Sequence, residues 1–521
     1  MPPAKPGTVT NAAIIGGRIL TMDSDDRIVN GSVIIRDGKI KSVSEGAGGP
    51  PGDPTSIRVD ATGHYVTPGL IDAWSGLGLS AGGPNSGGKA SLSALDALNG
   101  FERHDFEQVI RHGVTALCVE PPSGNGVAGA AALVRIEKVD DPTTATTPDV
   151  ALVIRLGLGN IGPFGRLAAL KALREQLESA RDYRDAWEEY EEELEKYKKD
   201  LKAGKTVKLK EAEEGEKKAE AKKPTPPPPE GRRGRRRGRS VDDDHDHGHD
   251  HRPTSDVEVG QIPNDGLPRC PRHPWIVVVC CCPEDEEQET QCEHDHVEEE
   301  PLPHWLTLDE DREKAKKKDD KSKGDFSKPD RPQRDPDQEM LVKALKHEIP
   351  VRIEVHRPAD VLNALELVRE FNLKATISGA TGAGYVATEL ADAEVSVLLN
   401  EFIPSATLDT SHSRDLHFEN ARRLAHAKVN LVVGTGAVSG RPRSAYLAQN
   451  AAIAAGYGLS NNDALRAITI NAARMCGVDE KIGSIEKGKL GDVVVWKGHP
   501  LSPDAEVKYV FVGGRQVYPA P

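Results

Sequence analysis

The chain has 521 residues and a net charge of −14, with 37% hydrophobic and 4% aromatic residues. This length fits two or three domains rather than one compact unit, and the net negative charge argues against a general nucleic-acid binder. The sequence has no run of about 20 apolar residues, which excludes a membrane-spanning helix, and its start lacks a secretion signal. We therefore expect a cytoplasmic protein without a membrane partner, in which the seven cysteines stay reduced.

The charged residues are concentrated in the middle of the chain. Residues 201–340 contain 27 Lys or Arg, 35 Asp or Glu and 16 of the 37 prolines. A segment of this composition cannot bury enough apolar surface to fold alone. The sequence therefore predicts that residues 201–337 form a charged, Pro/His/Cys-containing insertion that is largely disordered. We interpret its basic run, residues 232–239, as a solvated charge block rather than a nucleic-acid site.

Both ends of the chain have the composition of short β-strands. Asp37-Gly38 separates two such runs and is a strong signal for a two-residue hairpin turn. Gly513-Gly514 plays the same part near the C-terminus. Neither terminal set has enough apolar surface to stand alone. We predict that residues 8–67 and 480–521 together form one small composite β-sandwich.

Between these ends, eight β-branched, apolar runs alternate with helical patterns, which favours the α/β class and a (β/α)8 TIM-like barrel over residues 68–200 and 338–479. The predicted strands are Leu70–Trp74, Val114–Val119, Ala132–Ile136, Val150–Ile154, Val351–His356, Lys374–Ser378, Val395–Leu399 and Asn430–Gly434. No clear helix connects the third and fourth runs. A long helix is expected from about Arg166 to Asp200, amphipathic at first and then almost wholly charged.

Several blocks of sequence resemble the amidohydrolase superfamily. Residues 66–73 (VTPGLIDA) are similar to the entry into its first barrel strand, and residues 483–494 (GSIEKGKLGDVV) to its return into the small β-domain. Residues 94–138 and 349–362 resemble the imidazolonepropionase-like bacterial branch. The resemblance covers most of residues 8–199 and 338–521, whereas the insertion resembles no known family.

The resemblance implies metal-dependent hydrolysis of C–N bonds, with zinc or another divalent metal held at one mouth of the barrel. It also implies histidine or aspartate ligands at positions where this chain has other residues. These substituted positions are Trp74, Gly76, Gly379 and Gly436. A lysine that bridges two metals in some members is replaced by Arg135. Glycine and tryptophan side chains offer no electron pair to a metal, so the family mechanism is expected to be lost and no metal is expected in the barrel.

Two polar residues remain at the predicted mouth. Glu354 stands where the family has a histidine on its fifth strand, and His356 follows two residues later. Residues at i and i+2 of a strand share one face, so both side chains can enter the same pocket. They supply two ligands where a catalytic zinc site needs three. His356 is either a ligand-binding residue or a histidine satisfied by a neighbouring carboxylate.

The insertion has a second, separate set of candidate metal ligands. They are His245, His247, His249, His251, Cys280, Cys281, Cys282 and Cys292. Imidazole and thiolate groups together suit zinc, nickel or copper, but no paired Cys-x-x-Cys spacing is present. The segment is therefore either a weak, unselective transition-metal binder or a solvated tract with incidental thiols.

Three functions follow from these patterns. The first is a non-catalytic structural or regulatory subunit, in a homo-oligomer or in a hetero-oligomer with a catalytic paralogue. The second is an active hydrolase with a site rebuilt around Glu354 and His356. The third is a metal-handling protein that acts through the insertion. The apolar run Ile276–Cys282 and the charged helix are two surfaces that a monomer would leave exposed.

Overall fold

The computed structural model describes residues 10–46, 56–79, 88–121, 125–138, 145–156, 163–202, 328–400, 418–436 and 443–519. The chain divides into two units, one of residues 1–199 with 328–521 and one of residues 200–327. Almost all of the second unit, including every candidate ligand of the insertion and the run Ile276–Cys282, lies outside the described residues. Among the helices that are described, none has the length and apolar character needed to cross a membrane.

Strands from both ends of the chain form one eight-stranded sheet. They are β1 (Ala12–Leu20), β2 (Ile28–Arg36), β3 (Lys39–Glu45), β4 (Ile57–Asp60), β5 (Tyr65–Pro68), β14 (Val493–Lys497), β15 (Glu506–Val512) and β16 (Arg515–Tyr518). The order is β16-β15-β14-β5-β1-β2-β3, with β4 beside β1. The antiparallel pair β5–β14 joins the two ends. Ile14, Val33, Val493 and Phe511 belong to one buried cluster, so N- and C-terminal strands share a core.

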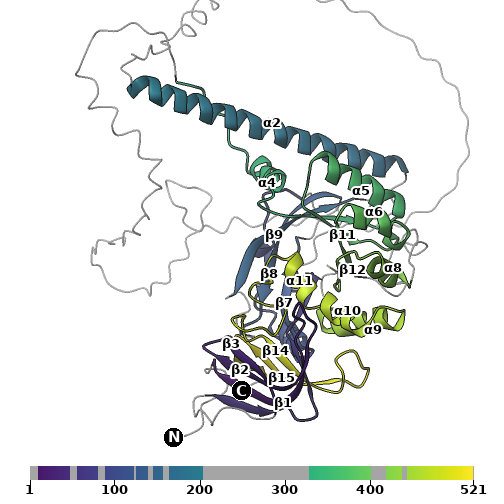
Figure 1. Cartoon of the computed structure of the whole chain (residues 1–521). Coiled ribbons are helices and arrows are strands. Elements are labelled where there is room, and N and C mark those ends of the chain that lie inside the picture. The colour runs from purple at the N-terminus through teal and green to yellow at the C-terminus, as the bar shows by residue number, and fades with distance from the viewer. Residues whose placement is uncertain are drawn as a thin grey trace, which may run out of the picture. The chain divides into compact units, whose positions relative to one another are not determined.

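A second eight-stranded sheet forms the barrel (Figure 1). Its strands are β6 (Leu70–Ser75), β7 (Val114–Val119), β8 (Gly126–Arg135), β9 (Thr146–Arg155), β10 (Val351–Val355), β11 (Ala375–Gly379), β12 (Ser396–Leu399) and β13 (Leu431–Val433). A parallel bridge between Ser75 and Gly436 brings the first and last strands together, so the barrel is nearly closed. The predicted barrel is confirmed, and each of the eight predicted runs contributes a strand.

One strand differs in direction from the (β/α)8 expectation. β8 runs antiparallel to both β7 and β9, whereas the other neighbouring strands of the barrel are parallel. A parallel neighbour needs a long crossover connection, usually a helix, and none links the third and fourth predicted runs. The missing helix was therefore the sign of an antiparallel hairpin.

The barrel is covered by helices, of which α2 is by far the longest. They are α1 (Arg103–Arg111), α2 (Pro163–Lys202), α4 (Pro336–Leu345), α5 (Pro358–Glu370), α6 (Ala387–Asp392), α8 (Asn420–His426), α9 (Leu447–Gly456), α10 (Asn461–Ala467) and α11 (Ile470–Met475). The long helix predicted from Arg166 is thus present and begins three residues earlier. Ser460 caps α10 by accepting a hydrogen bond from the Asp463 amide, at 3.0 Å.

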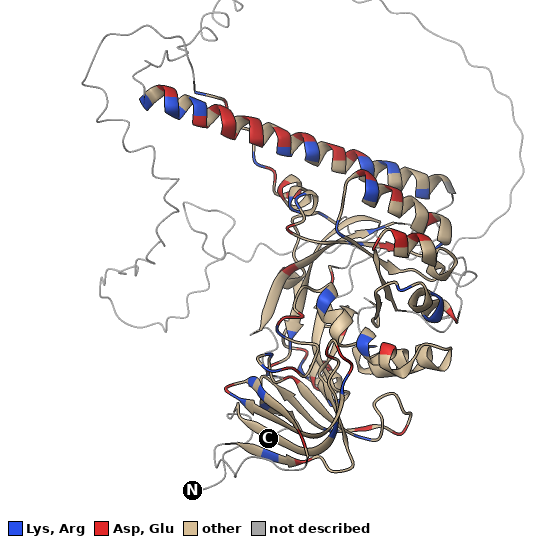
Figure 2. Cartoon of the chain, viewed as in Figure 1, with Lys and Arg blue, Asp and Glu red and all other residues tan. Residues whose placement is uncertain are grey.

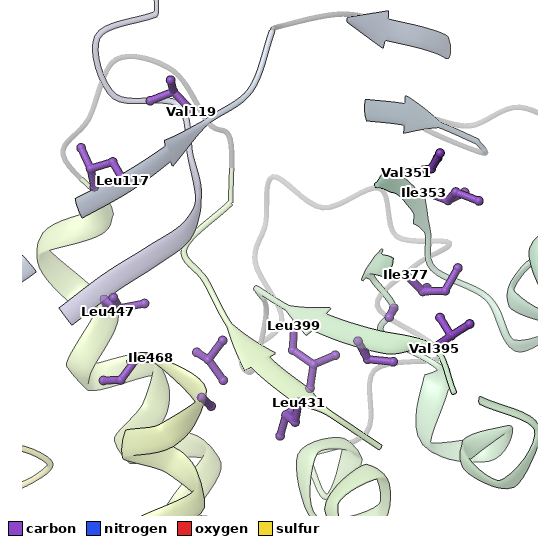
Figure 3. Packing of buried hydrophobic residues seen from close by; sticks show 14 of the residues in the cluster. Leu117, Val119, Val351, Ile353, Ile377, Val395, Leu399, Leu431, Leu447 and Ile468 are labelled. Carbon is purple, nitrogen blue, oxygen red and sulfur yellow. The ribbon is translucent and has the colours of Figure 1, made fainter. Parts of the chain in front are cut away.

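Successive side chains of each barrel strand point alternately to the outer core, under the helices, and to the barrel interior. On β10, Val351 and Ile353 pack outward in the cluster that contains Leu447 and Ile468 of the surrounding helical layer (Figure 3). The residue between them, Arg352, therefore points into the barrel, as does Glu354. This inward polar pair on an otherwise apolar strand begins the candidate site.

Candidate functional site

The sequence-predicted positions meet in two pairs at the C-terminal ends of the parallel strands. At one side of the mouth, the Gly436 amide donates to the Trp74 carbonyl at 2.9 Å. At the other side, Gly379 ends β11 directly beneath His356. Active sites of α/β barrels lie at this end of the strands, so the region is where family chemistry would take place. Gly76 follows β6 at the same end.

Glu354 and His356 lie together, as their spacing predicted. His356 Nε2 is 3.6 Å from Glu354 Oε1, and both side chains are buried. The other carboxylate oxygen of Glu354 accepts a hydrogen bond from Arg155 Nε at 2.9 Å. Burial alone would raise the pKa of Glu354, but the hydrogen bond with His356 and the charge of Arg155 hold it below its ordinary value. Glu354 is thus an ionised carboxylate already engaged by a cation.

Arg155 extends the contact into a network across the barrel. Arg155 ends β9, and its Nη2 lies 3.3 Å from Glu120, which follows β7. Glu120 also forms a short ion pair with Arg352 of β10. The four charged side chains Glu354, Arg155, Glu120 and Arg352 form a continuous chain of alternating sign, and none is more than 9% exposed. Two carboxylates and two guanidinium groups balance, so the interior carries no net charge from them.

Arg352 is the deepest member of this network. Its Nη1 donates to the Ala73 carbonyl at 2.8 Å and approaches Cys118 Sγ at 3.7 Å. Burial lowers the pKa of Arg352, but the charges of the Cys118 and Glu120 side chains raise it overall, so it stays protonated. These partners belong to β6 and β7, which are not neighbours of β10 in the sheet. The side chain therefore crosses the barrel and fills its interior.

Gly379 and Gly436, two positions at which the sequence analysis predicted substituted ligands, are packed against other side chains. A Cβ placed on Gly379 would lie 2.7 Å from His356 Cε1, and one on Gly436 would lie 2.8 Å from Asn400 Nδ2. Both glycines also have positive φ, +77° and +85°. Neighbouring side chains therefore occupy the space into which a ligand would project. Trp74 is also buried, at 3% exposure.

Asp72 closes the seam between the first and last barrel strands. Its carboxylate accepts hydrogen bonds from Ser444 Oγ at 2.6 Å and from Thr435 Oγ1 at 2.5 Å. The Thr435 and Trp74 amides donate to its other oxygen at 3.0 and 3.2 Å. Complete burial raises the pKa of Asp72 to about 6, against the lowering effect of these donors. Both oxygens of the Asp72 carboxylate therefore accept hydrogen bonds that join the first and last barrel strands, which gives Asp72 a structural role.

A divalent metal does not fit this set of residues. Of the donors that Glu354 and His356 supply at the mouth, among the described residues, the Glu354 carboxylate is already engaged by Arg155, which leaves His356 as a single ligand. A cation would also lie beside two buried guanidinium groups, which repel it. No group of three or more His, Cys, Asp or Glu residues within the described ranges has the geometry of a metal site.

One residue considered in the sequence analysis, Arg135, lies away from the mouth of the barrel. Arg135 forms ion pairs with Asp492 and Glu137, away from the mouth, because the antiparallel direction of β8 places its C-terminal residue at the opposite end of the barrel. The hypothesis that Arg135 replaces a bridging lysine is therefore wrong.

Comparison with known proteins relates part of the chain to a family. Residues 336–517 match the model described as Amidohydrolase family. An imidazolonepropionase of Erwinia tasmaniensis is 41% identical over 59 residues, 11% of this chain and 14% of that protein. The protein LONG AFTER FAR-RED 3 of Arabidopsis thaliana is 41% identical over 66 residues, 12% of this chain and 11% of that protein. The aligned segments thus span only a small part of both relatives.

The fold has a counterpart along nearly its whole length. A solved amidohydrolase from Thermotoga maritima MSB8 superposes with a TM-score of 0.61 at 20% identity, covering 97% of this chain and 99% of that one. At this identity the likeness shows the fold alone. The family model matches about a third of the chain, and the barrel with its appended sheet has the fold of a solved amidohydrolase, so residues 336–517 resemble the amidohydrolase family.

Proposed function

We propose that this amidohydrolase-like protein is non-catalytic by the family mechanism and serves as a structural or regulatory subunit of an oligomer. The observation that carries the proposal is the ion-pair network Glu354–Arg155–Glu120–Arg352. The network supports the proposal because two buried guanidinium groups would repel a metal cation bound beside Glu354. Loss of ligands with retention of the barrel leaves association as the simplest function for the fold.

The network also opposes a rebuilt active site. A general base must be able to accept a proton from an attacking water, and the pKa of Glu354 lies below its ordinary value because His356 and Arg155 hold the carboxylate ionised. A low pKa makes Glu354 a weak base. Its acceptor atoms are also turned toward these two side chains rather than toward an open position.

Zinc titration of the full-length chain tests the proposal. One variant, Glu354→Gln with His356→Gln, removes both candidate ligands of the barrel, and a second replaces His245, His247, His249 and His251 with alanine in the insertion. We expect the barrel variant to bind the same amount of zinc as the unmodified chain, because the described residues of the barrel include no group of three metal ligands. Zinc binding that is tight, stoichiometric and lost only in the barrel variant would overturn the proposal.

The same proteins separate the remaining functions. Hydrolysis of simple amides and ureides is expected to be absent with and without added zinc. An activity abolished in the barrel variant, Glu354→Gln with His356→Gln, would establish the rebuilt hydrolase instead. Zinc binding lost only in the insertion variant would assign metal handling to the insertion and leave the barrel non-catalytic.

A further inference from the structure

Two cysteines, Cys118 and Cys476, lie together in the core of the barrel. Cys118 belongs to β7 and is fully buried, and Cys476 directly follows α11 and is 4% exposed. Both belong to one buried cluster with Ala73 and Val432 of the barrel strands, and the two thiols are hydrogen-bonded to each other. Neither cysteine forms a disulfide in the structure. The function proposed above gives this pair of thiols no role.

The fold holds the two thiols in contact although they are far apart in the sequence. β7 lies next to β6 in the barrel sheet, and the Ile71 amide of β6 donates to the Ile468 carbonyl, just before α11, at 2.9 Å. A disulfide requires the sulfur atoms to approach to about 2 Å. Cys476 has room to make this movement, because it is followed by Gly477, which has a φ of +65° and no described neighbour within 4 Å of an added Cβ.

The guanidinium of Arg352 makes the two thiols unequal. Charged residues are sparse on the barrel strands (Figure 2), and β7 has none, yet Arg352 Nη1 lies 3.7 Å from Cys118 Sγ. The hydrogen bond from Cys118 and the charge of Arg352 lower the pKa of the Cys476 thiol, against the opposing effect of burial. The same hydrogen bond, together with burial, raises the pKa of Cys118. Cys476 is therefore biased toward the thiolate, whereas Cys118 stays protonated.

A thiolate in contact with a protonated thiol has the chemistry of a peroxide-sensitive pair. The thiolate is the form of cysteine that reacts with peroxide, and the sulfenic acid that results condenses with a neighbouring thiol. Hydrogen peroxide is small and uncharged, which suits a site where only Cys476 has any exposed surface. Because that surface is small, we expect a slow reaction that depends on local opening around the end of α11.

We propose that hydrogen peroxide converts Cys118 and Cys476 into a reversible disulfide, with Cys476 as the attacking residue and Cys118 as the resolving residue. The Cys476 thiolate attacks one peroxide oxygen and the O–O bond breaks. The departing hydroxide takes up the proton that the Cys476 thiol has lost, which gives a sulfenic acid and water. The Cys118 sulfur then attacks the Cys476 sulfur, the S–S bond forms, the S–O bond breaks, and hydroxide leaves with the Cys118 proton as a second water. This modification does not depend on whether the barrel is catalytic.

Peptide mapping of the full-length chain tests the site. The folded protein is treated with hydrogen peroxide, its remaining thiols are blocked with N-ethylmaleimide, and its digest is analysed by mass spectrometry. We expect a cross-linked pair of peptides that contain Cys118 and Cys476, and we expect dithiothreitol to separate them. Mapping distinguishes this bond from bonds among the other five of the seven cysteines. The same treatment in urea is the matched control, in which the unfolded chain should lose the preference for this pair.

Two single substitutions test the roles of the thiols. In Cys118→Ser the attacking thiol has no resolving partner, so Cys476 should accumulate as a sulfenic acid that dimedone labels. In Cys476→Ser, Cys118 should stay reduced at the same peroxide concentration. The rate of disulfide formation in the unmodified chain should rise with pH through a pKa below the ordinary value of cysteine, because the thiolate of Cys476 is the reacting form.

Other outcomes overturn the inference. If peroxide leaves both thiols of the folded protein unmodified, the pair is inert packing. Dimedone labelling of Cys118 in Cys476→Ser, with Cys476 unlabelled in Cys118→Ser, refutes the roles assigned from the charge of Arg352. A Cys118–Cys476 bond that forms equally well in urea does not come from the folded site. Circular dichroism checks that each variant keeps its fold, and if one does not, the peptide map of the unmodified chain still decides whether the disulfide forms.

Discussion

The imidazole of His356 occupies the space that a side chain at Gly379 would need, with Cε1 2.7 Å from an ideal Cβ at that position. The backbone of Gly379 also has a φ of +77°, which side-chain-bearing residues rarely adopt. A side chain at position 379 and the present position of the His356 ring therefore exclude each other. Restoring a histidine at 379 would require His356 to move.

This relationship predicts that Gly379→Ala destabilises the protein more than a matched glycine substitution. Gly63→Ala is the control, because Gly63 has a φ of +75° and nothing within 4 Å of the added Cβ. We expect Gly63→Ala to cost about 1 kcal/mol for its backbone, and Gly379→Ala to cost a further 1–3 kcal/mol, roughly, from overpacking against His356. Urea unfolding measures both. Adding His356→Ala to Gly379→Ala should recover part of the excess, and equal costs at the two glycines would contradict the packing argument.

Gly436 should tolerate substitution by alanine better than Gly379. The atom nearest to a Cβ on Gly436 is Asn400 Nδ2, the end of a side chain, and its next nearest neighbour is 3.7 Å away. The Asn400 amide can rotate away from an added Cβ. By contrast, three atoms of the His356 ring lie within 3.1 Å of a Cβ placed on Gly379. We expect Gly436→Ala to lower the free energy of unfolding by about 1 kcal/mol, the cost of a side chain at positive φ, and by little more. A thermal shift as large as that of Gly379→Ala would show that Asn400 is fixed.

The sequence was sufficient to place all eight barrel strands, because each is a β-branched apolar run such as Val114–Val119 or Val351–Val355. Hydrophobic periodicity carries no information on strand direction, so the only sign of the antiparallel direction of β8 in the sequence was the missing helix between β8 and β9. The two-residue turns at Asp37-Gly38 and Gly513-Gly514 were predicted correctly, and all four residues have positive φ. Local signals of this kind depend only on neighbours in sequence.

The network was missed because its members are distant in sequence. Glu120 follows the last residue of β7, and Arg155 is the last residue of β9. In the sequence, each of them has the pattern of a solvated loop charge. Arg352 offered a usable signal, because it alternates with valine and isoleucine on a strand otherwise buried on both faces. A charge at such a position must meet an opposite charge in the interior. The partner, however, could be identified only from the folded barrel.

Breaking this network should be costly. Arg155→Met leaves the buried carboxylates of Glu354 and Glu120 with fewer cationic partners, and we expect a loss of about 3–5 kcal/mol in the free energy of unfolding at neutral pH. The cost should shrink as pH falls through the lowered pKa of Glu354, because a protonated carboxyl no longer needs the cation. Arg174→Met, which removes the exposed pair with Glu370, should cost less than about 1 kcal/mol. Similar costs for the two variants would contradict a structural role for the network.

The carboxyl of Asp72 should give the protein a distinct pH dependence of stability. Its pKa is about 6 in the folded chain and 3.8 ordinarily, so the folded state holds the proton more tightly. The stability from this group is fully present below pH 3.8 and is lost as pH rises through 6, by about 3 kcal/mol in total. Asp72→Asn, which cannot ionise, should remove this loss from a plot of unfolding free energy against pH. Ser444→Ala removes a donor to the ionised form, at 2.6 Å, and should instead move the loss to higher pH. If neither variant changes the profile between pH 4 and 7, roughly, Asp72 does not titrate there and is held ionised by its four donors.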